Sequence, residues 1–114
     1  MPDKRVINIS REFSATPFGR YRSDGLESGE VFRETMLIPA LRESSSVTLD
    51  IDGVAGLPSS FWEEAIGGLI RRDWAAEQVR QKLTIVTTDR ELLVFVRLAW
   101  RYLDEADRKV RKPA

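Results

Sequence analysis

The chain has 114 residues, of which 42% are hydrophobic and 32% charged, and its 18 basic residues balance 18 acidic ones. A chain of this length and composition folds as one domain around a single core. It contains no cysteine and no histidine, which excludes disulfides, thiolate metal sites and catalysis by Ser-His-Asp or Cys-His arrangements. The zero net charge gives no bulk attraction to nucleic acid, and no apolar run reaches the ~18 residues of a membrane span.

These bounds set the first expectations. We expect a single cytoplasmic domain over residues 1–108, followed by a basic, flexible tail over residues 109–114. No cofactor, no metal, no nucleic-acid partner and no membrane partner is expected.

The first quarter of the chain predicts a strand and a long loop. The apolar residues of VINIS, residues 6–10, favour a short first strand. Residues 11–25 form the longest irregular stretch, with Pro17 and two glycines as punctuation. Within this stretch, residues 18–22 are a candidate hairpin partner for the first strand.

A helix and a strand are predicted next. Ser28 opens a helix whose apolar residues recur at helical spacing as far as Leu41. Pro39 is expected to kink or restart this helix, because proline lacks an N–H group and disfavours helical geometry at the preceding residue. Residues 47–51 alternate apolar and polar side chains, which predicts a strand.

The helix after this strand is predicted to begin near Ser59 and Ser60. With Ser60 as the N-cap, Glu63 falls at the third helical position and completes a capping box. Glu64 is expected to be solvated. Residues 63 and 64 point about 100° apart on a helix, so we do not expect the two carboxylates to converge.

The last third predicts a short helical turn, a strand and a long helix. These elements are expected over residues 75–81, 83–87 and 89–107 respectively. Thr88 and Glu91 have the spacing of a second capping box. Trp74 is the tryptophan that we expect at the surface, where it would contact a partner.

Strands that alternate with helices predict an α/β fold with a mostly parallel sheet, or an α+β fold if the helices cover only one face. Gly67 and Gly68 lie inside a predicted helix, where each glycine costs about 1 kcal/mol relative to alanine. The pair therefore indicates close approach of another backbone, either that of the sheet beneath or that of a partner helix.

The first candidate site is the start of the helix at Ser59 and Ser60. A helix N-terminus carries free N–H donors and a partial positive charge, so it stabilises an added negative charge such as a phosphoryl group. The alternative is that the two serines serve only as helix caps.

Four motifs give the chain a resemblance to a known family. They are FGRYRSDG (18–25), SGEVFR (28–33), LIPAL (37–41) and SSFWEEAIGG (59–68). With them, the chain resembles a bacterial STAS-like family of unknown function, related to the STAS domains of anti-sigma factor antagonists. This resemblance implies a STAS-like sheet of four to five strands, mixed and mostly parallel, with helices packed against it.

The resemblance also implies a function. In anti-sigma factor antagonists, a serine at the start of the corresponding helix is phosphorylated by a partner that is both an ATPase-type kinase and an anti-sigma factor. The corresponding residue here is Ser59. Pro58 and Phe61 stand where the STAS turn has an aspartate and a glycine.

The second candidate site is a group of arginines with a neighbouring helix start, which together suit an anion or a nucleotide phosphate. Its residues are Arg20, Arg22, Ser28, Glu30 and Arg33. The alternative is a solvated loop, with arginines paired to nearby acids and Ser28 as a helix cap.

Two functions follow from these sites. The first is a non-enzymatic signalling module that docks a protein partner through the loop and helix at Ser59; the partner would be an ATPase-type kinase or an anti-sigma-like factor. The second is a small-ligand or nucleotide-binding domain that uses the Arg20–Arg33 segment. A homodimer through a free edge of the first strand is left open.

Overall fold

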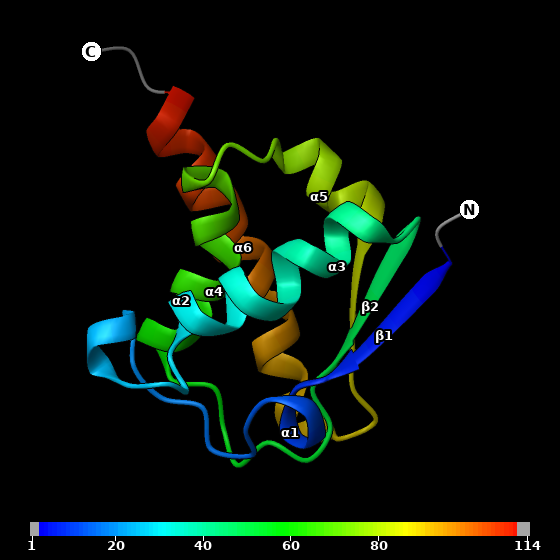
Figure 1. The fold of residues 1–114 in the computed structure, drawn as a ribbon, viewed down its shortest axis with the longest axis vertical. Helices are drawn as coiled ribbons and strands as arrows, with labels where there is room; N and C mark the ends of the chain where they lie inside the picture. Colours follow the sequence, from blue (N-terminus) through cyan, green and yellow to red (C-terminus); the bar gives the residue numbers. More distant parts are fainter. Residues whose placement is uncertain (1–2, 112–114) are drawn as a thin grey trace.

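The computed structural model describes residues 3–111, in which three parallel strands form a sheet with helices packed on one side (Figure 1). The strands are β1 (Lys4–Asn8), β2 (Ser46–Asp50) and β3 (Leu83–Val86), in the order β1-β2-β3. In the register, Val6 of β1 lies opposite Thr48 of β2, which lies opposite Thr84 of β3.

Six α-helices and three short non-α helical segments complete the described chain. The α-helices are α1 (Ile9–Glu12), α2 (Gly29–Phe32), α3 (Ile38–Glu43), α4 (Ser59–Arg71), α5 (Ala76–Lys82) and α6 (Leu93–Arg111). The others are two 3-10 helices, Arg22–Asp24 and Arg90–Leu92, and a π-helix, Arg33–Leu37.

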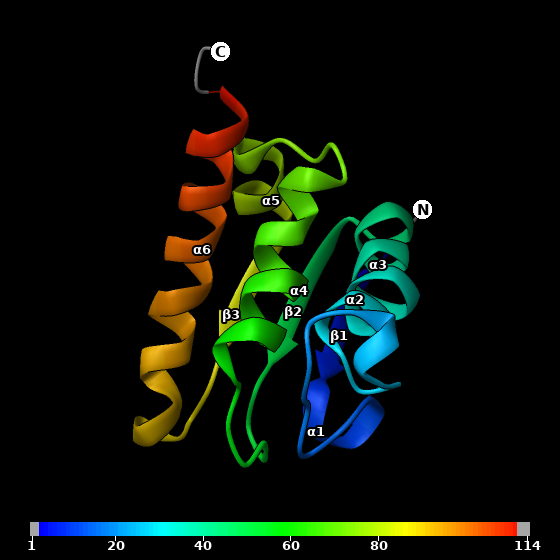
Figure 2. The ribbon, with the colours of Figure 1, turned by 90° about the vertical axis from the view of Figure 1, so that its left-hand side faces the viewer.

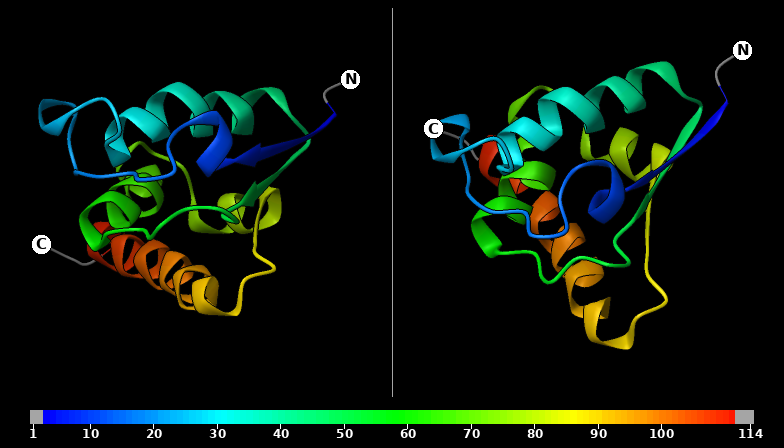
Figure 3. Two further views of the ribbon diagram at one scale, coloured as in Figure 1. Left: turned by 90° about the horizontal axis from the view of Figure 1, so that it is seen from below. Right: turned by 60° about the horizontal axis from the view of Figure 1, so that its bottom comes forward.

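The alternation of side chains along the strands determines which face of the sheet is covered. Val47 and Leu49 point into the core, as do the β3 residues Leu83 and Ile85. On the opposite face, Val6 is 57% exposed. Figure 3 shows the helices on one side of the sheet and none of them on the other.

The core lies between the sheet and two long helices. α4 and α6 run side by side (Figure 2), and nearly every residue of α4 from Phe61 to Ile70 is buried. Trp62 is fully buried, and its indole Nε1–H donates to the carbonyl oxygen of Phe95 at 2.7 Å. This bond fixes the start of α6 against α4.

The free edge of β1 is covered by two charged side chains. Arg5 donates to the carbonyl oxygen of Val6 at 3.3 Å, and Glu12 accepts from the backbone N–H of Asn8 at 2.9 Å. Arg5 and Glu12 also form an ion pair at 3.3 Å. Charged side chains that occupy the free backbone groups of an edge strand oppose pairing with another chain.

The structure corrects two expectations about the sheet. Residues 3–111 contain three strands instead of four to five, and all of them are parallel. Residues 18–22 do not pair with β1. Their backbone groups bond instead to the segment that enters α2; the N–H of Phe18, for example, donates to the carbonyl of Glu27 at 3.0 Å.

The expected break near Pro39 takes the form of a π-helix. Regular α geometry ends at Phe32, and it resumes at Ile38 with Pro39 in the first turn of α3. Ile38, the residue before Pro39, keeps helical backbone angles, φ −62° and ψ −46°. The proline therefore did not force it out of helical geometry. The wider π turn removes the need for an N–H at residue 39.

Both predicted capping boxes are wrong. α4 begins at Ser59 with Pro58 as its N-cap, and Glu63 pairs with arginines instead of the helix start. Asp89 caps the 3-10 helix before α6 by accepting from the N–H of Glu91 at 2.9 Å. The hydroxyl of Thr88 is engaged elsewhere in the site described below.

The last helix, α6, continues past residue 108 to Arg111. Lys109 and Arg111 are still helical, so the expected tail does not begin at residue 109. Residues 112–114 of that tail lie outside the described residues. Within residues 3–111, no helix combines the length and the apolarity required to cross a membrane.

Candidate functional site

The start of α4 presents two serine hydroxyls at a helix N-terminus. Ser59 is exposed and Ser60 is partly exposed, as the first and second residues of the helix. The hydrogen bonds found within residues 3–111 include none to either hydroxyl, so neither serine acts as a cap. The first N–H groups of a helix have no partner inside it, and they provide the positive end of the helix dipole here.

Beside this helix start lies a loop that holds apolar side chains in solvent. We call residues 18–27 the apolar loop. Phe18 is 67% exposed, Leu26 77% and Tyr21 52%. Figure 1 shows the loop on the same side of the molecule as the first turn of α4, and Arg20 of the loop reaches Glu63 of that helix.

Backbone hydrogen bonds fix the conformation of the apolar loop. One carboxylate oxygen of Asp24 accepts from the N–H groups of Arg20 and Tyr21, at 3.0 and 2.8 Å. Gly19 is required where the chain turns, because its φ is +92° and a Cβ there would lie 2.8 Å from the Cβ of Asp24. The loop is therefore a built structure, and its exposed side chains do not result from disorder.

The apolar loop is anchored to α4 through packing and charge. Gly29, at the end of the loop and the start of α2, contacts the carbonyl oxygen of Phe61, and a Cβ there would lie 2.9 Å from that of Glu64. Arg20 of the loop bonds Glu63 at 2.5 Å and Glu64 at 3.3 Å. Ser59 lies four residues before Glu63, hence on the same side of the helix.

Glu63 and Glu64 do converge, because their long side chains reach the same two arginines. Arg71, two turns further along α4, bonds Glu63 at 2.9 and 3.0 Å and Glu64 at 3.2 Å. Burial works to raise the pKa of Glu63, but hydrogen bonds from Arg71 and Arg20 outweigh it and leave that pKa below its ordinary value. Glu63 is thus held ionised, which does not suit it to proton transfer near neutral pH.

A buried ion pair joins the π-helix to α4. Arg33 is 5% exposed and Glu64 6% exposed, and Arg33 Nη1 lies 2.7 Å from Glu64 Oε2. The same nitrogen donates to the backbone carbonyl of Glu64 at 2.8 Å, and Arg33 Nε bonds Glu34 at 2.8 Å. Glu64 is therefore buried, contrary to the sequence-based expectation that it is solvated.

The two glycines of α4 make room for these charged groups. A Cβ on Gly68 would overlap the guanidinium of Arg33, with Cζ at 3.0 Å and Cδ at 3.2 Å. A Cβ on Gly67 would overlap the carboxylate of Glu63 and lie 3.3 Å from the carbonyl oxygen of Tyr102 on α6. The close approach is thus made mainly by the side chains of Arg33 and Glu63, and not by the backbone that the glycine pair led us to expect.

The arginine candidates from the sequence are largely occupied by protein groups. Ser28 is the buried N-cap of α2, and its hydroxyl accepts from the N–H of Val31 at 3.2 Å. Glu30 accepts from the backbone N–H of Arg22 at 2.8 Å. Arg20 and Arg33 are bound by carboxylates, so the group does not form an open cluster of cations.

A polar hollow at the carboxyl ends of β1 and β2 was not found from the sequence. It has a volume of about 310 Å³ and is lined by Asn8, Ser10, Arg11, Asp50, Asp52 and Gly53. Asp52 accepts from the hydroxyls of Thr87 and Thr88 at 2.5 and 2.7 Å. These hydrogen bonds hold the pKa of Asp52 below its ordinary value. The only indication of this hollow in the sequence is that Asp50 and Asp52 lie at the end of a predicted strand.

Two further observations bear on the expected site chemistry. Within residues 3–111, no three acidic side chains lie close enough together to hold a metal ion. Trp74, which was expected at the surface, is partly exposed and packs against the core.

Comparison with known proteins identifies one family. The family model described as a STAS-like domain of unknown function (DUF4325) matches residues 28–92, which include α2, α4 and the buried ion pair between Arg33 and Glu64. Neither the curated proteins nor the solved structures contain a match to this chain.

Proposed function

The chain belongs to the family of STAS-like domains of unknown function, and from this premise we propose that it is a non-enzymatic regulatory module that docks a protein partner. The docking surface consists of the apolar loop and the start of α4 at Ser59 and Ser60. The partner is an ATPase-type kinase or an anti-sigma-like factor of the bacterial cytoplasm. One observation carries the proposal: a loop fixed by its own hydrogen bonds holds Phe18 and Leu26 in solvent and is joined through Arg20 to Glu63, one turn after the exposed Ser59 of α4.

The energetics of the apolar loop support a binding role. Exposing two large apolar side chains forgoes about 1.5–3 kcal/mol of burial for each. A rigid loop can return that free energy on binding without a further cost of ordering, because its backbone is already fixed. Exposed apolar groups with a polar rim are typical of protein interaction sites. Here the rim includes Arg22, Asp24 and Glu27, which are all exposed.

The position of Ser59 supports a role for modification. A phosphoryl group on its Oγ would lie at the positive end of α4, where the helix dipole and free N–H groups stabilise negative charge. The reaction would transfer the γ-phosphoryl of ATP from the partner's nucleotide to the Ser59 hydroxyl, with release of ADP and a proton. Since Pro58 replaces the aspartate of the STAS turn, the nearest acid on the same side of α4 is Glu63, one turn away.

The nucleotide-binding alternative has less support. A phosphate at Arg20 or Arg33 would have to displace Glu63 or Glu64, and the Arg33–Glu64 pair is buried. Removing one partner from a buried ion pair costs about 3–5 kcal/mol. We therefore propose protein docking alone.

Affinity capture with matched variants tests the docking surface. The immobilised protein, Phe18→Ser/Leu26→Ser and the control Val6→Ser/Val86→Ser are compared by quantitative mass spectrometry of captured bacterial proteins. The control residues are also exposed valines, but they lie on the open face of the sheet. The proposal expects one partner that the control retains and the loop variant loses. Equal capture by all three proteins would remove the apolar loop from the function.

Phosphoryl transfer is tested separately. The captured partner and Mg-ATP are incubated with the protein, and intact-mass spectrometry follows the addition of one phosphoryl group. Ser59→Ala should abolish the addition and Ser60→Ala should preserve it. Undiminished addition to Ser59→Ala would assign the reaction to another residue and leave docking to be judged by the capture experiment.

A further inference from the structure

The exposed side of α6 carries a line of arginines. Arg97, Arg101, Arg108 and Arg111 are separated by four, seven and three residues, and all are exposed. At 100° per residue these positions fall within one arc of the helix surface. We call these four residues the arginine ridge. At 1.5 Å per residue, it extends over about 21 Å of the helix.

Most of this charge is not neutralised within residues 3–111. No carboxylate lies within 4.0 Å of the guanidinium of Arg97, Arg101 or Arg108 among the ion pairs of that range. Asp104 lies on the same side of α6, but Arg80 of α5 binds it at 2.6 Å. The single intrahelical pair of the ridge joins Arg111 to Asp107 at 3.2 Å. The ridge is therefore a local positive surface on a chain of zero net charge.

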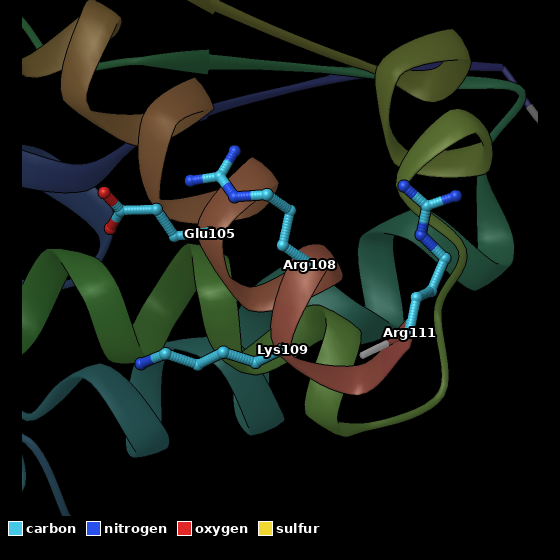
Figure 4. A pocket seen from close by; sticks show the side chains of 4 residues that line it. All are labelled: Glu105, Arg108, Lys109 and Arg111. Atoms are coloured by element: carbon cyan, nitrogen blue, oxygen red, sulfur yellow. The ribbon is translucent and has the colours of Figure 1, made fainter. Parts of the chain in front are cut away.

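Two hollows lie along the arginine ridge. The smaller has a volume of about 190 Å³ and is lined by Val94, Arg97, Leu98 and Arg101. The larger is an open depression of about 780 Å³ at the end of α6, lined by Glu105, Arg108, Lys109 and Arg111. Figure 4 shows Arg108 and Arg111 extending from the same side of α6, whereas Lys109 points to another side.

Apolar side chains accompany the charge. Leu93 and Val94, at the start of the ridge, are each 43% exposed. On a helix face that stays in water, exposed apolar side chains contribute no burial free energy. Their presence beside regularly spaced cations therefore distinguishes this surface from an ordinary solvated face. The surface offers contacts to a ligand that is itself both acidic and apolar.

We propose that the arginine ridge binds an acidic amphipathic helix of a protein partner. Carboxylates three, four or seven residues apart on such a helix match the spacing of the arginines, and Arg–carboxylate pairs are directional and often bidentate. Apolar residues beside those carboxylates would cover Leu93 and Val94. A helix of about 15–18 residues spans the ridge. This surface is separate from the apolar loop and does not depend on the function proposed above.

A nucleic acid is the other polyanion to consider, and the surface favours it less. Single-stranded nucleic acids bind through stacking on exposed aromatic side chains. The two aromatic residues in this part of α6, Trp100 and Tyr102, are partly buried against the core, and Arg80 packs over the Trp100 ring at 5.2 Å. The exposed side chains of Leu93 and Val94 would bury no apolar surface against a phosphate backbone.

A designed peptide tests the inference on the full chain. The probe is a fluorescent peptide of about 18 residues, with glutamates at the ridge spacing, leucines beside them and alanine elsewhere. Its partner for comparison has glutamine in place of each glutamate. Two charge-matched proteins are compared with the original chain: Arg97→Glu/Arg101→Glu, and the control Arg11→Glu/Arg42→Glu, whose exposed arginines lie outside the ridge. Circular dichroism establishes that both variants are folded.

The expected result is saturable binding of the acidic peptide that weakens about ten-fold or more in Arg97→Glu/Arg101→Glu and less than about three-fold in the control. Binding should also weaken as NaCl rises from about 50 to about 300 mM, because salt screens the ion pairs. Absent binding, equal losses in both variants, or equal binding of the glutamine peptide would overturn the inference. Tighter binding of single-stranded DNA of matched length than of the acidic peptide would also overturn it in favour of a nucleic acid.

Discussion

Replacing Gly68 by alanine should destabilise the protein, although the same change inside an ordinary helix stabilises it. Alanine is favoured over glycine in a helix interior by about 1 kcal/mol. At this position, however, the new Cβ would overlap the guanidinium of Arg33. Three atoms of that side chain lie within reach of the Cβ, so the entire side chain has to move.

The cost follows from what holds Arg33 in place. Its side chain is 6% exposed and contacts Glu34, the carboxylate of Glu64 and the backbone carbonyl of Glu64. Disrupting a buried ion pair costs about 3–5 kcal/mol. After subtraction of the helix-propensity gain, the free energy of unfolding of Gly68→Ala should fall by about 2–4 kcal/mol.

Urea denaturation followed by tryptophan fluorescence measures this change, with Gly56→Ala as the control. A Cβ on Gly56 meets no atom within 4 Å, and the φ of Gly56 is not positive, so this control should be nearly neutral. A second control is Arg33→Met, in which Gly68→Ala should be neutral or stabilising because the overlap is gone. If Gly68→Ala stabilises the original chain as much as it stabilises Arg33→Met, the steric account is refuted.

Three further predictions concern pH, the apolar loop and the core. The folded-state pKa of Glu63 is lowered, so the stability that its ionised form contributes is present above its unfolded pKa of about 4.5 and is lost as pH falls through the folded pKa. In melting curves from pH 7 to pH 3, the difference in stability between the original chain and Glu63→Gln should therefore disappear. A difference that stays constant would contradict this. Phe18→Ser/Leu26→Ser should shift the melting temperature by no more than a few degrees, since both side chains are exposed, whereas a large loss would show that the loop supports the fold. Trp62→Phe should cost about 1–3 kcal/mol in urea denaturation, because it removes the indole donor to the part-buried carbonyl of Phe95; an unchanged midpoint would contradict that role.

The order of elements could be predicted from the sequence because it depends on local patterns. The period-two alternation of residues 47–51 and the apolar stripe of α4 each determine one element, and both lie within a residue or two of the expected bounds. Residues 18–22 show where local patterns fail. Their backbone is satisfied by Glu27, Gly29 and Glu30, which are contacts of a closed loop that no strand propensity encodes.

The candidate site was predictable only in part. A helix start near Ser59 and Ser60 could be predicted from the serine pair and the apolar run after it, although the capping box expected there is wrong. The partners of Glu63 and Glu64 could not, because Arg20 and Arg33 come from distant parts of the chain and long side chains reach beyond their own helical position. The same applies to Asp52, whose hydroxyl donors lie 35 and 36 residues further along the chain.

The glycine pair of α4 is a pattern whose meaning could be inferred only in part from the sequence, because the expected contact was with backbone and the observed one is mainly with side chains. Gly67 and Gly68 lower the stability of an isolated helix, so their presence requires a compensating contact. The structure supplies it in Arg33 and Glu63. The arginine ridge is also visible in the sequence as spacings of three, four and seven, but its exposure depends on how α6 packs on α4.

Site-specific photo-crosslinking in bacterial cells gives the most direct test of docking through the apolar loop. A photoreactive amino acid replaces Phe18 in one strain and Val86, on the open face of the sheet, in another. The account predicts one dominant protein adduct from position 18, lost when Leu26→Ser is added, and no such adduct from position 86. Equal adducts from both positions, or an adduct from position 18 that Leu26→Ser leaves unchanged, would contradict it.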